Sequence, residues 1–168
     1  MSSDKSTASN TSRYLVKVSE TIPSISECMN FVTDPTCGAI STFSGITRNN
    51  FQQKKVLQLQ YEAYTPMAEK MMLTLCQTAQ SIYPDICKIA MVHILGNCPV
   101  GEASVIICVS SPHRKMSLDC VAYLIDELKA NVPIWKLEVY EGEEEGAVWK
   151  ENVEWKNGEK TRVMRRCT

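Results

Sequence analysis

One segment near the carboxyl end constrains the fold of this chain more than any other, because it holds a long helix and the strand that follows it. Ser111-Pro112 combines a helix-capping residue with a proline suited to a first turn, and the helix is predicted to run to about Asn131. Val132-Pro133 ends it, and alternating residues over 134–140 predict a strand. A chain with this segment is expected to pack a long helix against a sheet.

Five further strands are expected upstream of that segment. Runs of alternating or β-branched residues predict strands over residues 14–18, 37–46, 56–64, 88–95 and 104–110. The second and third of these are expected to pair as a hairpin across the polar loop 47–55. The order of elements predicts an α+β fold, with a mainly antiparallel sheet and helices packed on one side of it.

Two upstream helices are predicted from their start signals. Pro23 stands at the start of a short helix over residues 24–31, and Thr65 with Pro66 opens a longer one over residues 65–82. Apolar residues recur in the longer helix at helical spacing, and we expect them to fill the core rather than bind a cofactor. They are Met67, Met71, Leu75, Ala79 and Ile82.

Length and composition limit the possible function classes. With 168 residues, 44% of them hydrophobic, the chain can form one domain with a substantial core. A formal net charge of -1 argues against a nucleic-acid binder, and no apolar run approaches the roughly 20 residues that cross a membrane. We expect a disordered polar leader at residues 1–12, a domain at 13–156 and a basic tail at 157–168. The serines of the leader leave a transit peptide open.

The eight cysteines show no metal-binding pattern. None stands in a CxxC pair, and the only histidines, His93 and His113, cannot complete a zinc site with them. Most of the cysteines fall in predicted strands and helices, where buried free thiols behave as small apolar residues. We therefore expect reduced thiols, no bound metal and a cytosolic location.

Positive side chains gather in the helix-strand segment of an otherwise almost neutral chain. His113 and Arg114 stand at the expected helix start, where free N–H groups and the helix dipole favour an anion. An imidazole and a guanidinium there suit a phosphate-sized ligand. Two side chains that simply point into solvent explain the spacing equally well.

Three other cations are weaker candidates when each is taken singly. Lys129 falls in the last helical turn, where the helix dipole favours a cation in any protein. Lys136 lies on the last predicted strand, either as a snorkelling lysine or as a desolvated amine able to act as base or nucleophile. Arg48 follows the strand that ends near Gly45, in a loop where the backbone can approach a ligand.

Helix length constrains how these cations can cooperate. His113 and Lys129 are sixteen residues apart, so at a rise of 1.5 Å per residue their backbones are about 24 Å apart. One small ligand cannot touch both side chains within a single chain. If both serve one site, that site is shared between two chains, as a symmetric homodimer allows.

Four motifs in fixed order resemble the family of large, catalytic subunits of molybdopterin synthase. They are GITRNN at 45–50, LQYEAYTPMAE at 59–69, SSPHR at 110–114 and LKANVPIWK at 128–136. The resemblance covers roughly residues 37–140 and implies an α/β hammerhead fold. It also implies a homodimer within a heterotetramer, in which each large chain binds a small ubiquitin-like sulfur-carrier subunit.

The activity implied by this resemblance is a sulfur transfer that uses no metal or cofactor at this step. The carrier's C-terminal Gly-Gly thiocarboxylate enters the site, and two sulfurs convert cyclic pyranopterin monophosphate, also called precursor Z, to molybdopterin. Lys129 and Lys136 are the implied catalytic residues. The implied substrate-binding residues are Ile46, Thr47, Arg48, His113, Arg114, Lys129, Lys136, Leu137 and Glu138.

The chain departs from the family pattern at two positions. His93-Ile94 stands where the family usually has a His-Arg pair, and Leu137 stands where a second basic residue often follows the lysine. Two other functions compete with sulfur transfer. The complete set of cations speaks against a non-catalytic scaffold that only docks the carrier. The lack of an obvious nucleophile or carboxylate cluster speaks against a phosphate-ester hydrolase.

Overall fold

A computed structural model of the protein describes residues 13–142 and 149–151, with side chains up to residue 142. The expected leader at 1–12, most of the acidic segment after Tyr140, the domain end at 156 and the basic tail at 157–168 lie outside the described residues. Within the described part, no helix is both long and apolar enough to cross a membrane.

A four-stranded sheet forms the centre of the domain, with the strand order β1-β5-β7-β2. In that order the strands span Tyr14–Ser19, Lys88–Ile94, Ala103–Ser111 and Ala39–Ile46. β1 pairs parallel with β5, whereas β5 with β7 and β7 with β2 are antiparallel. The two central strands are almost wholly buried and rich in β-branched residues, because helices cover both of their faces.

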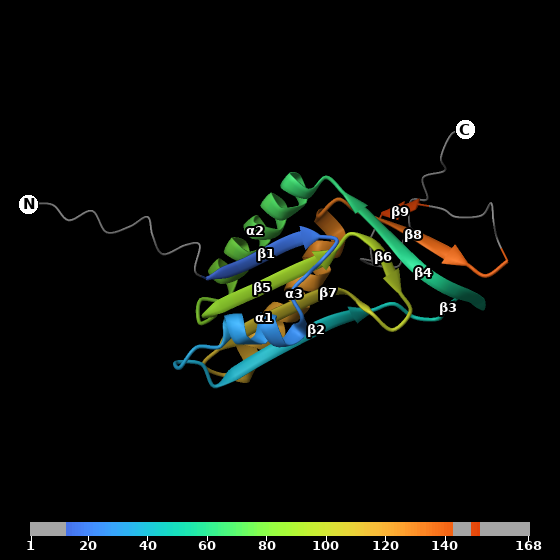
Figure 1. Ribbon diagram of the computed structural model, residues 1–168. Helices are drawn as coiled ribbons and strands as arrows, with labels where there is room; N and C mark the ends of the chain where they lie inside the picture. The colour runs from blue at the N-terminus through green and yellow to red at the C-terminus, as the bar shows by residue number, and fades with distance from the viewer. Residues whose placement is uncertain (1–12, 143–148, 152–168) are drawn as a thin grey trace, which may run out of the picture.

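A second sheet extends from one end of the first and is visible at the right of Figure 1. Its main path is β3-β4-β8-β9, and β6 pairs with the other edge of β4. These strands are β3 (Asn50–Phe51), β4 (Lys54–Ala63), β6 (Gly96–Pro99), β8 (Ile134–Tyr140) and β9 (Trp149–Glu151). All of its pairings are antiparallel, so the predicted mainly antiparallel α+β fold is confirmed.

The predicted hairpin between residues 37–46 and 56–64 is wrong. β2 pairs with β7 in the first sheet, while β4 pairs with β3, β6 and β8 in the second. The register of β2 shifts between Gly45 and Ile46, and the next residue, Thr47, bonds through its backbone to Gly101 and Glu102. The chain is therefore anchored to the β6–β7 turn at this point and passes into the other sheet.

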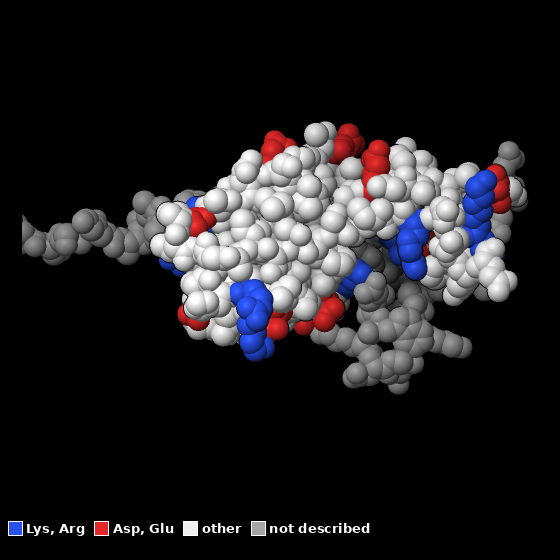
Figure 2. Space-filling model, turned by 90° about the horizontal axis from the view of Figure 1, so that it is seen from below, with Lys and Arg blue, Asp and Glu red and all other residues white. Residues whose placement is uncertain are grey.

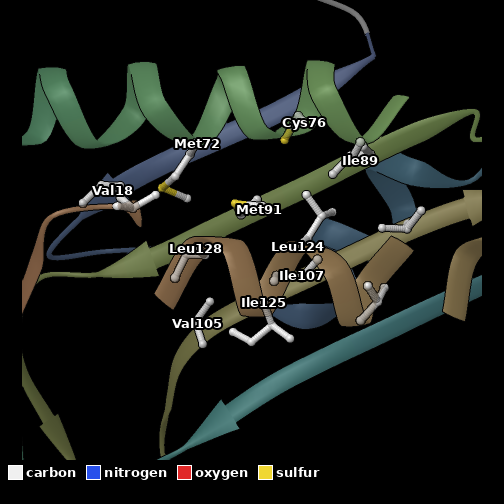
Figure 3. Packing of buried hydrophobic residues seen from close by; sticks show 14 of the residues in the cluster. Val18, Met72, Cys76, Ile89, Met91, Val105, Ile107, Leu124, Ile125 and Leu128 are labelled. Carbon is white, nitrogen blue, oxygen red and sulfur yellow. The ribbon is translucent and has the colours of Figure 1, made fainter. Parts of the chain in front are cut away.

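Two long helices cover one face of the first sheet, and a short helix covers the other. α2 (Thr65–Ile82) and α3 (Arg114–Asn131) pack on the face that Ile107 and Met91 share, and α1 (Ile25–Val32) packs on the opposite face. The expectation of helices on one side is therefore wrong for α1. Figure 3 shows the layer beneath the long helices, with side chains of Met72, Leu124 and Leu128 directed onto the sheet.

The prediction for α2 is confirmed at Ala79, which is buried, and at Met71 and Leu75, which pack against the core, but the other fully buried positions lie one residue further along. Its buried side chains are Ala68, Met72, Cys76 and Ala79, whereas Met67 and Ile82 are half exposed. Tyr64, not Thr65, is the N-cap of α2. Small residues at three of the four buried positions let the helix axis approach the sheet closely, which explains the choice of this stripe.

The expectation of reduced thiols is confirmed for five cysteines and wrong for two. Cys28, Cys76, Cys98, Cys108 and Cys120 are free and buried. Cys37 and Cys87 form a disulfide between the segments that lead into β2 and β5. The two strands begin on either side of the end of β7, because both pair with it there, at Ser110 and Ser111.

Candidate active site

α3 separates the predicted site residues at its amino end from those at and beyond its carboxyl end. The helix is one uninterrupted element of 18 residues, which corresponds to a length of about 27 Å. His113 is its N-cap, and Lys129 lies in its last turn. The expected separation of these two side chains within one chain is therefore confirmed.

The amino end of α3 presents two basic side chains. His113 and Arg114 are exposed, and neither side chain has a partner among the described residues. The N-cap makes no side-chain hydrogen bond to the first turn, so the N–H groups of that turn are not capped by it. Lys115 differs from both, because its ammonium is 2.7 Å from the carboxylate of Asp119. This end of the helix has the charge and the open donors that an anion requires.

Close backbone contacts hold this end in place. The N–H of Gly38, which precedes β2, donates to the carbonyl of Pro112 at 3.3 Å, and the Ser111 hydroxyl donates to the carbonyl of His113 at 2.7 Å. A Cβ atom at Gly38 would lie 2.8 Å from the Pro112 oxygen, so only glycine allows this approach without a shift. One helical turn on, the buried hydroxyls of Ser41 and Ser117 hydrogen-bond at 2.8 Å.

The strand after α3 holds Lys136 against a buried carboxylate. The Nζ atom of Lys136 is 3.2 Å from Oε1 of Glu138, whose side chain is only 5% exposed. The Tyr140 hydroxyl donates to the other carboxylate oxygen. These three residues alternate along β8 and therefore share one face, while Leu137 faces the other way. Lys136 is thus an ion-paired cation rather than an isolated buried amine.

The third group of predicted residues lies at the end of β2. Ile46 is half exposed and Arg48 is exposed, whereas Thr47 between them is buried. The Thr47 hydroxyl lies 3.2 Å from Sγ of Cys98 in β6. Its buried side chain and backbone bonds fix the loop that carries Arg48.

Strand pairing connects this loop to the Lys136 group. Cys98, Leu59 and Glu138 stand side by side on β6, β4 and β8. Two strand spacings of about 4.8 Å each therefore place Glu138 roughly 10 Å from Cys98, the residue that Thr47 contacts. Lys129 stands at the same end of α3, only a few residues before β8. Lys129 and Lys136 are thus linked by the short connection from α3 to β8, and Arg48 is linked to β8 through Thr47, Cys98 and the pairing of β6, β4 and β8.

A buried polar cluster under this end was not predicted. Tyr61 is the strand partner of Lys136, and its ring meets that of His93 edge-on with centroids 4.8 Å apart. Burial raises the pKa of Tyr61 to about 12 and lowers the pKa of His93 to about 4. Nδ1 of His93 donates to the Ile94 carbonyl at 2.8 Å, and its buried Nε2 has no partner among the described residues. Both groups are therefore neutral at physiological pH.

Tyr140 was also not predicted as a site residue. Its i, i+2 spacing from Glu138 on a predicted strand is the sequence signal that could have identified it.

No group of His, Cys, Asp and Glu in the described part is arranged to hold a metal ion.

The fold and the site together define a class of protein. This is an α+β domain in which one long helix carries basic side chains at both ends, and the strand after it carries a lysine supported by a buried carboxylate, as binding of an anionic small molecule requires. The sequence pattern of the MoaE protein family matches residues 18–131, so the chain belongs to that family. The family predicted from the four motifs is confirmed.

Individual relatives agree with this assignment. A molybdopterin synthase catalytic subunit from Taeniopygia guttata is 53% identical over 139 residues, which cover 82% of this chain and 88% of that protein. The crystal structure of molybdopterin synthase from Staphylococcus aureus matches with a TM-score of 0.71 and 32% identity, over 82% of this chain and 95% of that one. A Helicobacter pylori complex of subunits 1 and 2 of molybdopterin-converting factor shares the fold, with a TM-score of 0.59, 20% identity and coverage of 78% and 91%.

Proposed function

We propose that this chain is the catalytic subunit of a molybdopterin synthase. It transfers sulfur from the thiocarboxylated C-terminus of a small carrier protein to cyclic pyranopterin monophosphate. The observation that carries the proposal is the Lys136–Glu138–Tyr140 group on the strand that follows α3, within a chain of the MoaE family. Such a group offers fixed positive charge where a phosphate binds and where negative charge develops as sulfur attacks.

The cations divide between binding and chemistry. Arg48, His113 and Arg114 bind the phosphate and orient the pterin, because exposed guanidinium and imidazole groups can form charge-assisted bonds to phosphate oxygens. Lys129 and Lys136 stabilise the charge that forms at the reacting carbons. Ile46, Thr47 and Leu137 line the site. Glu138 acts on Lys136, since its buried carboxylate fixes where the ammonium lies.

The reaction requires a second protein. The carrier supplies the sulfur, which agrees with the five free cysteines of this chain being buried in its core. The solved relative from Helicobacter pylori is a complex of two different subunits, and this supports a small partner here. We place the reaction in the cytosol, in a heterotetramer of two large and two small chains.

The length of α3 requires that a second large chain contribute residues to the site. His113 and Lys129 stand about 24 Å apart along α3, too far to touch one phosphorylated pterin. We infer that His113 and Arg114 of one protomer complete the site of the other. Mixing His113→Ala with Lys129→Ala protein tests this. Hybrid dimers then hold one intact site of two, so random exchange restores about a quarter of the wild-type rate. No recovery despite demonstrated subunit exchange contradicts the shared site.

A direct assay tests the function itself. The protein is incubated with thiocarboxylated carrier and cyclic pyranopterin monophosphate, and the dithiolene product is measured. Product formation that depends on all three components is the expected result. If the carrier binds and no product forms, the chain is a docking scaffold and the proposal is wrong.

A further inference from the structure

Two cysteines differ from all the other cysteines in the described part of the chain. Cys37 and Cys87 are bonded to each other and half-buried, whereas the five free cysteines are 0% exposed. Burial raises the pKa of all five free thiols, and it raises the pKa of Cys76, Cys108 and Cys120 to about 12. Buried thiols of this kind carry almost no thiolate at neutral pH. Among the described residues, thiol chemistry is therefore open to the bonded pair.

The disulfide spans the end of a central strand. β2 and β5 flank β7 in the first sheet, and both begin where β7 ends, at the left of Figure 1. Cys37 and Cys87 stand just before these two strands, and the N–H of Cys87 donates to the Ser110 carbonyl of β7 at 2.9 Å. The bridge therefore runs from one flank of β7 to the other, beside the turn that leads into α3.

Contacts other than the disulfide also hold the two cysteine segments together. Lys88 follows Cys87, and its ammonium lies 3.6 Å from the carboxylate of Asp34. Asp34 accepts hydrogen bonds from the N–H and the hydroxyl of Thr36, at 3.0 and 2.7 Å, and that hydroxyl lies 3.7 Å from the Cys87 sulfur. These bonds remain when the disulfide is broken, so the two sulfurs stay at a high effective concentration and can close again.

One cysteine segment is bonded to the turn that places the amino end of α3. Gly38 follows Cys37 and donates its N–H to the Pro112 carbonyl at 3.3 Å, one residue before His113. A restraint on Cys37 is therefore a restraint on this turn. Figure 2 shows the Lys and Arg side chains of the face seen from below in separate groups, with uncharged surface between them. Since no neighbouring group replaces a displaced one, ligand binding depends on where the helix start is held.

We propose that Cys37 and Cys87 form a redox-active site that exchanges with thiols of the glutathione class. The oxidised pair holds the amino end of α3 in its substrate-binding position, and the reduced pair releases it. The effect on substrate rests on the proposed function, whereas the exchange itself does not. Thiols are kept reduced in the cytosol, where we place the reaction, and disulfides found there are usually transient, catalytic or redox-sensing. A half-buried disulfide is accessible to such exchange.

The exchange uses two thiols for each disulfide. A glutathione thiolate attacks one sulfur of the pair, a mixed disulfide forms, and the other cysteine leaves as a thiolate that takes up a proton. A second glutathione thiolate attacks the glutathione sulfur of the mixed disulfide and releases the remaining cysteine, which is protonated in turn. Two electrons pass to the protein, and two glutathione molecules become one oxidised glutathione. Oxidised glutathione closes the pair again by the reverse steps.

Alkylation followed by mass spectrometry tests the site. Cys167 lies outside the described residues, so the Cys167→Ser protein is used, which keeps seven of the eight cysteines. In oxidised glutathione the native protein is expected to take up neither iodoacetamide nor glutathione. In excess reduced glutathione it is expected to take up two labels, at Cys37 and Cys87, and a return to oxidised glutathione should close the pair again. Two labels in every buffer, or a pair that stays closed in excess reduced glutathione, would overturn the proposal.

Hydrogen exchange and kinetics test the coupling to α3. Reduction is expected to speed exchange of the Gly38 N–H at least about tenfold, because its bond to the Pro112 carbonyl opens more often. The KM for the pterin should rise at least about threefold with kcat nearly unchanged, once the glutathione has been removed under nitrogen. Equal Gly38 exchange, or an equal KM, in the two redox states would overturn the coupling.

A double variant is the matched control for both measurements. Protein with Cys37→Ser and Cys87→Ser is expected to give the values of the reduced protein in either glutathione buffer, with an unchanged circular dichroism spectrum. A response of this variant to glutathione would assign the effect to other groups and overturn the site. Labelling and Gly38 exchange need no substrate or carrier. A redox-dependent Gly38 exchange in a chain that makes no dithiolene would therefore support the redox site and overturn the proposed function.

Discussion

At its amino end α3 presents His113 and Arg114 to solvent, whereas beyond its carboxyl end Lys136 lies against the buried carboxylate of Glu138. Both regions are cationic, and both belong to the same proposed site. They differ in what holds the charge in place. Tyr140 and Glu138 fix the Lys136 ammonium before any ligand arrives. Only the backbone is fixed at the other end, through Gly38 and Ser111.

The difference indicates that the two ends have different roles, one in turnover and the other in substrate binding. A preorganised charge stabilises a transition state without the cost of reorganisation, so substitutions near Lys136 should act mainly on turnover. Free surface side chains lose conformational entropy when a ligand orders them, and salt screens them, so substitutions near Arg114 should act mainly on substrate binding. Kinetic constants can separate these two behaviours.

The largest effect is expected from Lys136→Ala. We expect kcat to fall about 10²- to 10³-fold, because a fixed charge next to the reacting atoms is lost. Lys136→Arg keeps the charge and should retain part of the rate. Lys88→Ala is the matched control, since Lys88 is also a partly buried strand lysine, 3.6 Å from Asp34. Dithiolene production with saturating carrier and pterin measures the effect, and equal rates for the Lys136→Ala and Lys88→Ala proteins would contradict the assignment.

The buried cluster under the carboxyl end predicts a pH-dependent stability. The pKa of His93 is lowered to about 4 by burial, below its unfolded value of about 6.5. The unfolded chain therefore binds the extra proton first as the pH falls, and this lowers the free energy of unfolding between about pH 6.5 and pH 4. The loss is about 3 kcal/mol at the lower limit.

Urea unfolding at pH 7, 5 and 4 measures this loss. His93→Phe removes the titrating ring and should remove this part of the pH dependence. His113→Phe is the natural comparison, because the other imidazole of the chain is exposed at the amino end of α3. We expect it to retain the wild-type pH profile. If His93→Phe also retains that profile, the buried imidazole is not the source of the pH dependence.

Much of the secondary structure was predictable because it depends on local signals. The bounds of α2 agree with the prediction, and α3 ends at the predicted residue, since capping residues, prolines and helical periodicity act within a few residues. β8 agrees for the same reason, and its alternation alone places Lys136 and Glu138 on one face. The order of the three helices and the six predicted strands therefore follows from the sequence, whereas the short strands β3, β6 and β9 were not predicted.

Long-range pairing was not predictable from local signals. The expected partner of β4 was β2, its neighbour in sequence, but the buried Thr47 anchors the chain to the β6–β7 turn and carries β4 into the second sheet. β6 was missed because GNCP shows neither alternation nor β-branched residues. Burial of Glu138 depends on this pairing, which explains why the sequence identified the residue and not its role as the fixed partner of Lys136.

A smaller effect is expected at the amino end from Gly38→Ala. The added Cβ would lie 2.8 Å from the Pro112 oxygen, so the turn before His113 must move. We expect a loss of about 2 kcal/mol in the free energy of unfolding and a rise in the KM for the pterin. Thermal unfolding and steady-state kinetics measure the two changes. Unchanged stability together with an unchanged KM would show that the close approach at Gly38 does not position the helix start.

The smallest effect is expected from Arg114→Ala. Its guanidinium is exposed and makes no contact with the described residues, so stability should change by less than about 0.5 kcal/mol. The KM for the pterin should rise about tenfold with kcat nearly unchanged, because a charge-assisted bond to phosphate is lost. Added salt should reduce the difference from wild type, since an exposed charge is screened.

Lys115→Ala is the control for this effect, because the adjacent ammonium is also exposed but is already paired with Asp119. Removing it should change the KM by less than about twofold, since an exposed i,i+4 pair contributes only a few tenths of a kcal/mol. A larger effect from Lys115→Ala than from Arg114→Ala would mean that net positive charge, not a specific guanidinium, attracts the substrate to this end of α3. A fall in kcat for Arg114→Ala equal to that for Lys136→Ala would mean that both ends of the helix take part in the chemical step, and the division between a binding end and a catalytic end would be wrong.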